Sequence, residues 1–278
     1  MKNILKIMLM MITIFTIAGS AVYAAEIPVS DQDQLITSRD WTEISNLQDE
    51  MKKEEPDATI DYDKALKVYV DCNLIKLQTA DTKKLTSALE SANYVWVIPF
   101  KMEKTYGMFT VAKGLPLSEE AKSVLTKAEQ EEVKNHAGKW MITEIAEHTV
   151  EPYYDILLEK REALSDCTRV VLVGSQPGMR QPVALGMDDE TARIWISLGY
   201  QYPVMEKIPE TQNVESGVYS FDSVAEISDT YIEDSEVSTG VGVQSRSSMK
   251  YVAGIGIIVI GSIIILSVLK KKKLEDYE

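Results

Sequence analysis

The sequence predicts a single α+β domain in which helices pack on an antiparallel β-sheet of five or six strands. Along residues 58–207, segments with a two-residue apolar repeat alternate with segments that have the three- and four-residue repeat of helices. Several of the predicted strands are separated by turns too short for a parallel crossover, so neighbouring strands are expected to run antiparallel. About 150 residues are enough for a hydrophobic core of this kind.

The first half of this domain is predicted to contain a strand, a helix and a hairpin. From Leu66 to Cys72, apolar and polar residues alternate, which indicates a strand with one buried face. Asp81 can cap a helix that ends near Ser91. Residues 94–100 and 107–112 are rich in branched and aromatic side chains on either side of a polar turn, which predicts a β-hairpin.

The second half is predicted to contain two helices and a three-stranded meander. Ser118 can cap one long, charged helix that extends to about Asn135, and Pro152 can begin another helix. Residues 139–145 alternate weakly and could be a further strand. The strands of the meander, which are joined by short turns, are predicted at residues 169–173, 182–187 and 191–198.

Two segments that differ from the domain in composition flank it. Residues 25–57 are polar and are expected to be loose, apart from a short helix between Ser38 and Met51. Residues 208–250 are rich in serine and acidic residues and have no apolar period, which predicts an extended stalk. The alternative for part of this stalk is that residues 218–232 add a strand or a short helix to the domain.

The N-terminus has the features of a cleavable secretory signal. Two lysines precede a short apolar run, and small residues follow it. The run is too short to cross a bilayer as an ordinary transmembrane helix. We expect residues 1–24 to be removed by cleavage between Ala24 and Ala25, with an uncleaved anchor as the alternative.

The C-terminus has the features of a membrane anchor. The segment from Tyr251 to Leu269 carries no charge and is rich in isoleucine. As a helix it would span about 28 Å, close to the hydrocarbon thickness of a bilayer. Four basic residues follow it directly, and such a cluster stays on the cytoplasmic side. These residues are Lys270, Lys271, Lys272 and Lys273.

Together the two ends predict a single-pass protein of the cell membrane, with its domain outside the cell and residues 270–278 in the cytoplasm. The exported segment has no Asn-x-Ser/Thr sequon, and the ends of the chain are rich in lysine and isoleucine. This composition favours a bacterial source.

The chain has two cysteines, Cys72 and Cys167, and both lie in the exported part. An even number of cysteines in an oxidising compartment permits a disulfide bond. Cys72 ends one predicted strand and Cys167 precedes another, so antiparallel pairing of these strands would bring the two cysteines to the same edge of the sheet. The alternative is a pair of buried thiols that pack like small apolar residues.

The sequence contains no motif that predicts a catalytic, cofactor-binding or metal-binding residue. His136 and His148 lack the spacing of a zinc-protease helix. Residues 174–178 have glutamine where a nucleophile elbow needs serine, and a strand rather than a helix follows, so a turn is expected there. Residues 188–190 are three consecutive acids, which supply too few oxygens for calcium.

The charge of the chain limits its partners. The formal net charge is −14 at pH 7. A domain this acidic should repel nucleic acid and anionic lipid headgroups. Beyond the membrane that the anchor spans, the expected partner is therefore a protein or a polymer of the cell envelope.

Three functions are compatible with these features. The first is a non-catalytic module of the cell surface or envelope that binds another molecule. The second is a tethered envelope enzyme of the hydrolase type, which would need a histidine beside a serine or a carboxylate in a concave site. The third is an accessory subunit of a membrane complex.

Overall fold

We analysed a computed structural model of the chain. It describes residues 27–232 except for 149–150, 175, 180, 201 and 209–212. The predicted signal peptide with its cleavage site at Ala24 and Ala25 lies outside these residues. The predicted anchor from Tyr251 to Leu269 and the lysines at positions 270–273 also lie outside them. Among the residues that are described, no helix is both long enough and apolar enough to span a membrane.

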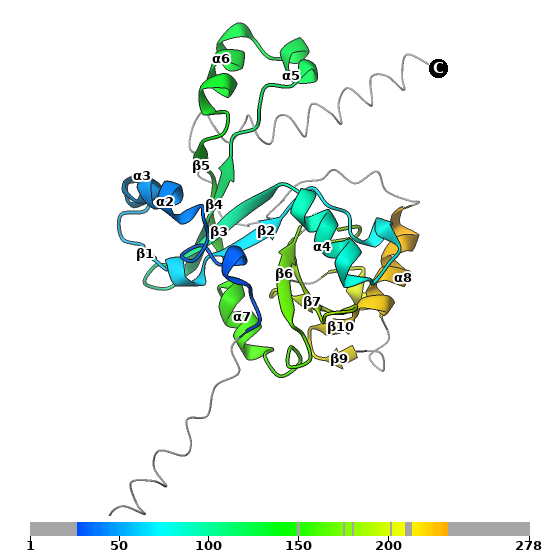
Figure 1. The fold of residues 1–278 in the computed structure, drawn as a ribbon. Helices are drawn as coiled ribbons and strands as arrows, with labels where there is room; N and C mark the ends of the chain where they lie inside the picture. The colour runs from blue at the N-terminus through cyan, green and yellow to red at the C-terminus, as the bar shows by residue number, and fades with distance from the viewer. Residues whose placement is uncertain are drawn as a thin grey trace, which may run out of the picture.

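The centre of the molecule is one mixed β-sheet of ten strands (Figure 1). Nine strands follow the order β5-β4-β3-β2-β6-β7-β8-β10-β9, and β1 pairs with β3 beside this path. Each pair of neighbours is antiparallel except β2 and β6, which run parallel. The strands are β1 Thr59–Ile60, β2 Leu66–Tyr69, β3 Tyr94–Lys101, β4 Tyr106–Lys113, β5 Trp140–His148, β6 Arg169–Val173, β7 Val183–Met187, β8 Ala192–Ser197, β9 Asn213–Glu215 and β10 Val218–Ser220.

The α+β class is confirmed, but the predicted antiparallel sheet of five or six strands is wrong in both number and pairing. The sheet is larger because β9 and β10, which follow residue 207, and the two-residue strand β1 join it. It is mixed because the chain leaves the edge strand β5 and passes through α7 (Tyr153–Glu159), and it then enters β6 beside β2 in the middle of the sheet. Such a crossover over several strands can join neighbours that run parallel.

The helices form largely where their caps predict. The Asp81 carboxylate accepts a hydrogen bond from the Lys84 amide at 3.1 Å, which confirms the cap of α4 (Thr82–Ser91). The predicted long helix after Ser118 is instead two helices, because Thr126 adopts an extended conformation and forms a capping box for the second. The remaining α-helices are α2 Trp41–Ile44, α3 Gln48–Glu54, α5 Glu119–Val124, α6 Lys127–His136 and α8 Phe221–Ile232.

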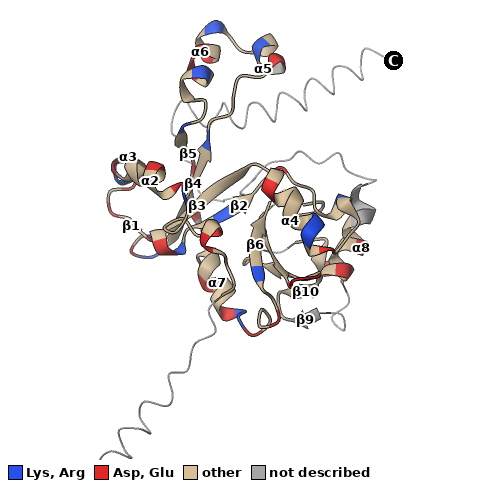
Figure 2. Cartoon of the chain, in the orientation of Figure 1, with Lys and Arg blue, Asp and Glu red and all other residues tan. Residues whose placement is uncertain are grey.

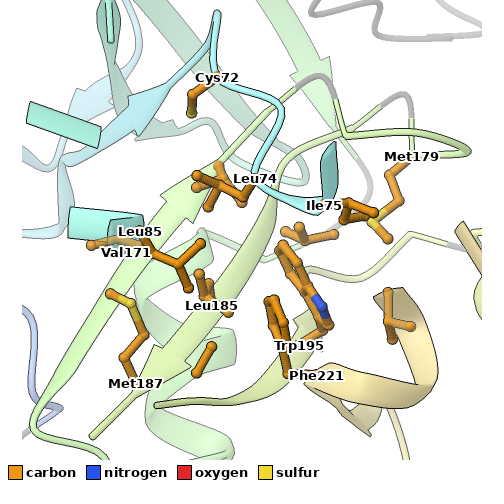
Figure 3. Packing of buried hydrophobic residues seen from close by; sticks show 14 of the residues in the cluster. Cys72, Leu74, Ile75, Leu85, Val171, Met179, Leu185, Met187, Trp195 and Phe221 are labelled. Atoms are coloured by element: carbon orange, nitrogen blue, oxygen red, sulfur yellow. The ribbon is translucent and has the colours of Figure 1, made fainter. Parts of the chain in front are cut away.

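The two faces of the sheet are covered differently. On one face, which we call the shared face, Val68 of β2 and Leu172 of β6 lie in a single apolar cluster that α7 covers. The opposite face, which we call the split face, carries two separate clusters. One lies over β3–β5 and is covered by α2 and α3. The other lies over β6–β8 and is covered by α4 and α8, with Trp195 stacked on Phe221 (Figure 3).

Both flanking segments contribute to the folded part. β10 pairs with β8, and α8 packs on the split face through Phe221 and Val224. The alternative in which residues 218–232 add structure is thus confirmed, and these residues are not part of a stalk. At the other flank, Ile27 and Val29 are buried although residues 25–37 were expected to be loose. The fold therefore extends beyond residues 58–207 in both directions.

Candidate functional site

The junction between β2 and β6 is the most unusual place in the sheet. Only two residue pairs join these strands, Val68 with Leu172 and Tyr69 with Val173. Toward the N-terminal ends of β2 and β6 the two strands no longer pair with each other. Residues 27–35, which we call the strap, lie between them there. Val29 of the strap forms a parallel bridge to Val170, and Gln34 forms an antiparallel bridge to Leu66. The strap thus completes the sheet where its two halves part.

The strap places a carboxylate inside this junction. Asp33 is 2% exposed. One of its oxygens accepts a hydrogen bond from the Tyr69 hydroxyl at 2.8 Å and lies 3.6 Å from Lys67 Nζ. The other accepts hydrogen bonds from Arg169 Nη2 at 3.0 Å and from Ser30 Oγ at 2.6 Å. We call Asp33, Lys67, Tyr69 and Arg169 the junction cluster.

Lys67 lies among aromatic rings. Its Nζ is 4.6 Å from the ring centroid of Tyr94, 5.3 Å from that of Trp96 and 5.8 Å from that of Tyr69. Rings at this distance attract a cation through their negative faces. Burial lowers the pKa of Lys67, although the Asp33 carboxylate acts in the opposite direction. The prediction that Lys67 lies on an exposed face of its strand is therefore wrong, since all four residues of β2 are buried.

A second carboxylate holds the aromatic rings in place. Asp40 accepts hydrogen bonds from the Tyr94 hydroxyl at 2.8 Å and from Trp96 Nε1 at 3.0 Å. Burial, and next the bond to Asp40, raise the pKa of Tyr94. Burial and the charge of Asp33 likewise raise the pKa of Tyr69. Both phenols therefore stay protonated and donate to the carboxylates at neutral pH.

The guanidinium of Arg169 is only partly satisfied. Its Nη2 contacts Asp33 and also lies 3.4 Å from the Tyr69 hydroxyl. Its Nε is buried and has no hydrogen-bond partner within the described part of the chain. A guanidinium usually binds a carboxylate with two parallel bonds. Asp33 of the strap thus bonds to one nitrogen of the guanidinium, which could bind an oxyanion through two nitrogens.

Cys72 and Cys167 do not form a disulfide bond. Because β2 and β6 run parallel, Cys72, which follows β2, and Cys167, which precedes β6, lie at opposite ends of the pair, separated by at least the five residues of β6, about 16 Å. They also belong to clusters on opposite faces of the sheet. A disulfide needs Cα atoms within about 7 Å. The antiparallel pairing that would have joined them is absent, and both are free, buried thiols whose pKa burial raises to about 11.

The structure describes the side-chain surroundings of one of the two histidines. His136 lies on α6, and its Nδ1 is 2.9 Å from the backbone oxygen of Glu132, one turn earlier. The side chain of His148 lies outside the described part. Within the described ranges, no group of three or more His, Cys, Asp or Glu side chains is arranged to hold a metal ion.

Both predicted turns are present. The Gln176 carbonyl accepts a hydrogen bond from Met179 at 2.9 Å, and Gly178 has φ +72°, as a type II turn with Pro177 in its second position requires. At the acidic turn, Asp188 accepts hydrogen bonds from the amides of Glu190 and Thr191, which lowers its pKa. These contacts occupy Asp188 within its own hairpin.

One further ionisable residue was missed by sequence analysis. Glu144 follows a β-bulge in β5 and lies opposite Thr110, whose hydroxyl is 3.4 Å from the carboxylate. Burial raises its pKa. Its charge also affects Tyr153 and Tyr200, which are hydrogen-bonded to each other. Bulges often redirect side chains beside functional sites, but no periodicity in the sequence marks this one.

Comparisons with protein-family models, with curated proteins and with solved structures found no match to this chain. The functional argument therefore rests on the geometry of the chain itself.

Proposed function

We propose that this chain is a non-catalytic binding module, exported and held at the outer face of the cell membrane by the span from Tyr251 to Leu269. The single observation that carries this proposal is a helical projection. Residues 114–138, which we call the arm, contain α5 and α6 and extend away from the sheet beyond β4 and β5 (Figure 1).

The helices of the arm extend away from the hydrophobic core. No residue of α6 is buried. Its base is closed by backbone hydrogen bonds, from Gly114 to Lys139 at 2.9 Å and from Gly138 to Gly114 at 2.7 Å. Ser118 and Thr126 cap the two helices through their side chains. Helices this short are marginal in water when they pack against nothing. A partner that covers the arm would supply the missing burial.

The surface of the arm suits a protein partner. Leu115 is 49% exposed and Val124 is 40% exposed, so apolar side chains face solvent at the start of the arm and in α5. Acidic and basic residues are interspersed on the arm, with ion pairs between Lys122 and Glu119 and between Lys134 and Glu131 (Figure 2). The arm has five acidic and three basic residues, so its net charge is −2. Such a surface combines apolar contacts with a polar rim, as protein interfaces do.

Two competing proposals remain. An enzyme of the hydrolase type is supported by Glu144, a partly buried carboxyl beside two tyrosines, whereas the described hydrogen bond of His136 is to the backbone of its own helix. An accessory subunit of a membrane complex differs from a free module only in its partner. It predicts that a membrane protein co-purifies after mild detergent extraction.

Cysteine labelling tests the topology. The native cysteines are buried, so they should react slowly with a membrane-impermeant maleimide and provide a low background. We expect Ala128→Cys, on the exposed surface of the arm, to be labelled on intact cells. We expect Tyr277→Cys to be labelled only after permeabilisation. The reverse pattern would contradict the proposed orientation.

Photocrosslinking tests the binding function. A photoreactive amino acid at Val124 should give a discrete adduct in cells that express the full chain. The same amino acid at Lys83, which is exposed on α4, is the matched control. An adduct from Val124 and none from Lys83 supports the arm as the contact element. Equal labelling at both positions, or none, would remove the support.

A further inference from the structure

The gap that the strap fills is a groove with its own recognition chemistry, distinct from the arm. It lies between β2 and β6, where the strap bridges both of them. The amide of Val170 donates to the Pro28 carbonyl at 2.8 Å, and the Ala65 carbonyl accepts from the Leu35 amide at 3.2 Å. The groove therefore offers backbone groups from two different strands to an extended segment, which is how sheets accept an added strand.

Apolar anchors hold the strap on both sides of its carboxylate. Ile27 and Val29 pack into the cluster of the shared face. Leu35 is fully buried in the cluster over β3–β5, on the split face. The strap therefore passes through the sheet plane, and only a chain with apolar residues at both ends of an extended segment can fill these positions.

The positive charges of the groove favour a bound segment that carries a carboxylate. Lys67 and Arg169 both belong to the body, and the strap supplies the carboxylate that lies between them. Asp33 reaches only one nitrogen of the guanidinium, and the buried Nε stays unpaired among the described residues. The groove thus keeps a donor for an oxyanion even when the strap is in place.

The position of the strap in the chain allows it to dissociate from the groove. It precedes all described elements of the fold, so no other strand has to move before it departs. It joins α2 through residues 36–40, of which Ile36 and Thr37 are exposed. Its end lies two residues beyond Ala25, where cleavage of the signal is predicted.

We propose that this groove is a binding site for an extended segment of a partner protein, one that carries a carboxylate between apolar anchors, and that the strap is its resident occupant in cis. The partner segment replaces the strap, places its carboxylate between Lys67 and Arg169, and can engage the Nε that Asp33 leaves unpaired. The strap then acts as an internal competitor that sets how readily the partner binds.

The test uses the full chain in detergent with a protease site inserted between Ile36 and Thr37. The protein folds first and is then cut, so that the strap stays bound non-covalently. A fluorescent peptide of residues 27–35 is the probe, and binding is followed by fluorescence anisotropy. We expect the cut chain to bind the peptide by exchange with its own strap, and the uncut chain to bind it at least about tenfold more weakly.

Matched peptides identify the carboxylate. The Asp33→Asn peptide should bind about tenfold or more weakly than the parent, since it loses charge-assisted bonds. The Asp31→Asn peptide changes an exposed carboxyl two positions away and should bind like the parent. In a cut chain that carries Arg169→Gln, the difference between the parent and Asp33→Asn peptides should shrink.

Three results would overturn the proposal. The first is a cut chain that does not bind the parent peptide, including one that unfolds and is not restored by added peptide. The second is equal binding of the parent and Asp33→Asn peptides. The third is an intact chain that forms a dimer abolished by Asp33→Asn, because the groove would then belong to a second copy of this chain and not to a separate partner.

Discussion

The strap and the arm are both polar segments, and the fold treats them in opposite ways. The strap has a carboxylate that is 2% exposed and lies between a lysine and an arginine. The arm contains a ten-residue helix that buries nothing. The strap also has apolar anchors on both sides of its carboxylate, whereas no residue of α6 is buried. The strap is buried because a gap between two strands needs backbone partners and a negative charge, whereas the arm lies beyond the end of a hairpin where no apolar surface faces it.

This comparison also separates two ways to stabilise a charged segment. In the strap, ion pairs and hydrogen bonds are shielded from water, so losing one partner leaves a buried charge. In the arm, ion pairs such as Lys134 with Glu131 are exposed and contribute little. The following predictions test the difference, beginning with the largest effect.

Removal of the strap's charge should have the largest effect. Asp33→Asn keeps the shape of the side chain but leaves Lys67 and Arg169 without a carboxylate, so we expect the free energy of unfolding to fall by about 3 kcal/mol. Urea denaturation of the full chain measures this. The control, Asp31→Asn, should change stability by about 0.5 kcal/mol or less. Equal effects of the two substitutions would mean that the junction cluster does not hold the strap.

Removal of the lysine should have a smaller effect. Lys67→Met replaces a cation with an apolar chain of similar length among three aromatic rings, while Arg169 still neutralises Asp33. We expect a loss of about 1 kcal/mol or less in the same urea measurement. A loss as large as that of Asp33→Asn would contradict the assignment of Arg169 as the main partner of Asp33.

Substitution of Glu144, a partly buried carboxyl, should increase stability at neutral pH, in contrast to the loss expected for Asp33→Asn. Burial raises the pKa of Glu144 above its ordinary value of 4.5, so the folded state takes up a proton more readily than the unfolded state. Its contribution to stability is therefore greatest in acid and declines as the pH rises through the raised pKa. Glu144→Gln should be more stable than the parent at pH 7, and the gap should close toward pH 4. Thermal unfolding at both pH values measures the gap; a gap that widens toward pH 4 would show that the pKa is not raised.

Removal of the arm should have the smallest effect on stability. Replacement of residues 115–137 by Asn-Gly keeps the glycines at the base and joins β4 to β5 through a short turn. We expect the free energy of unfolding of the body to change by about 0.5 kcal/mol or less, and the crosslink from the arm to be lost. A large loss of stability would mean that the arm packs on the body.

Features that depend on residues close in sequence were predicted, whereas the pairing of strands distant in sequence was not. The cap at Asp81, the hairpin of β3 and β4, and the turn at Pro177-Gly178 each depend on residues close in sequence, so the sequence could predict them. The parallel pair of β2 and β6 depends on a crossover through α7, and neither strand carries a mark of it. For this reason Cys72 and Cys167 are free, buried thiols, which was the alternative to a disulfide.

The candidate site was missed for a related reason. Lys67 alternates with apolar residues, so it was assigned to a solvent-facing side of its strand. It is buried because β2 is a central strand with both faces covered, and because a carboxylate arrives from a segment 34 positions earlier in the chain. A lysine between two apolar neighbours, with tyrosine two positions later, does not reveal such a partner. Only the topology brings Asp33, Lys67 and Arg169 together.

Amide hydrogen exchange of the full chain tests the contrast between strap and arm most directly. The Leu35 amide bonds to Ala65, and the Val170 amide bonds to Pro28, so both report on strap docking. We predict that these two amides exchange as slowly as those of β3 and β4, that Asp33→Asn accelerates both, and that the amides of α6 exchange much faster through local opening. If Leu35 and Val170 exchange as fast as α6, or if Asp33→Asn leaves them unchanged, the strap is not held by the junction cluster.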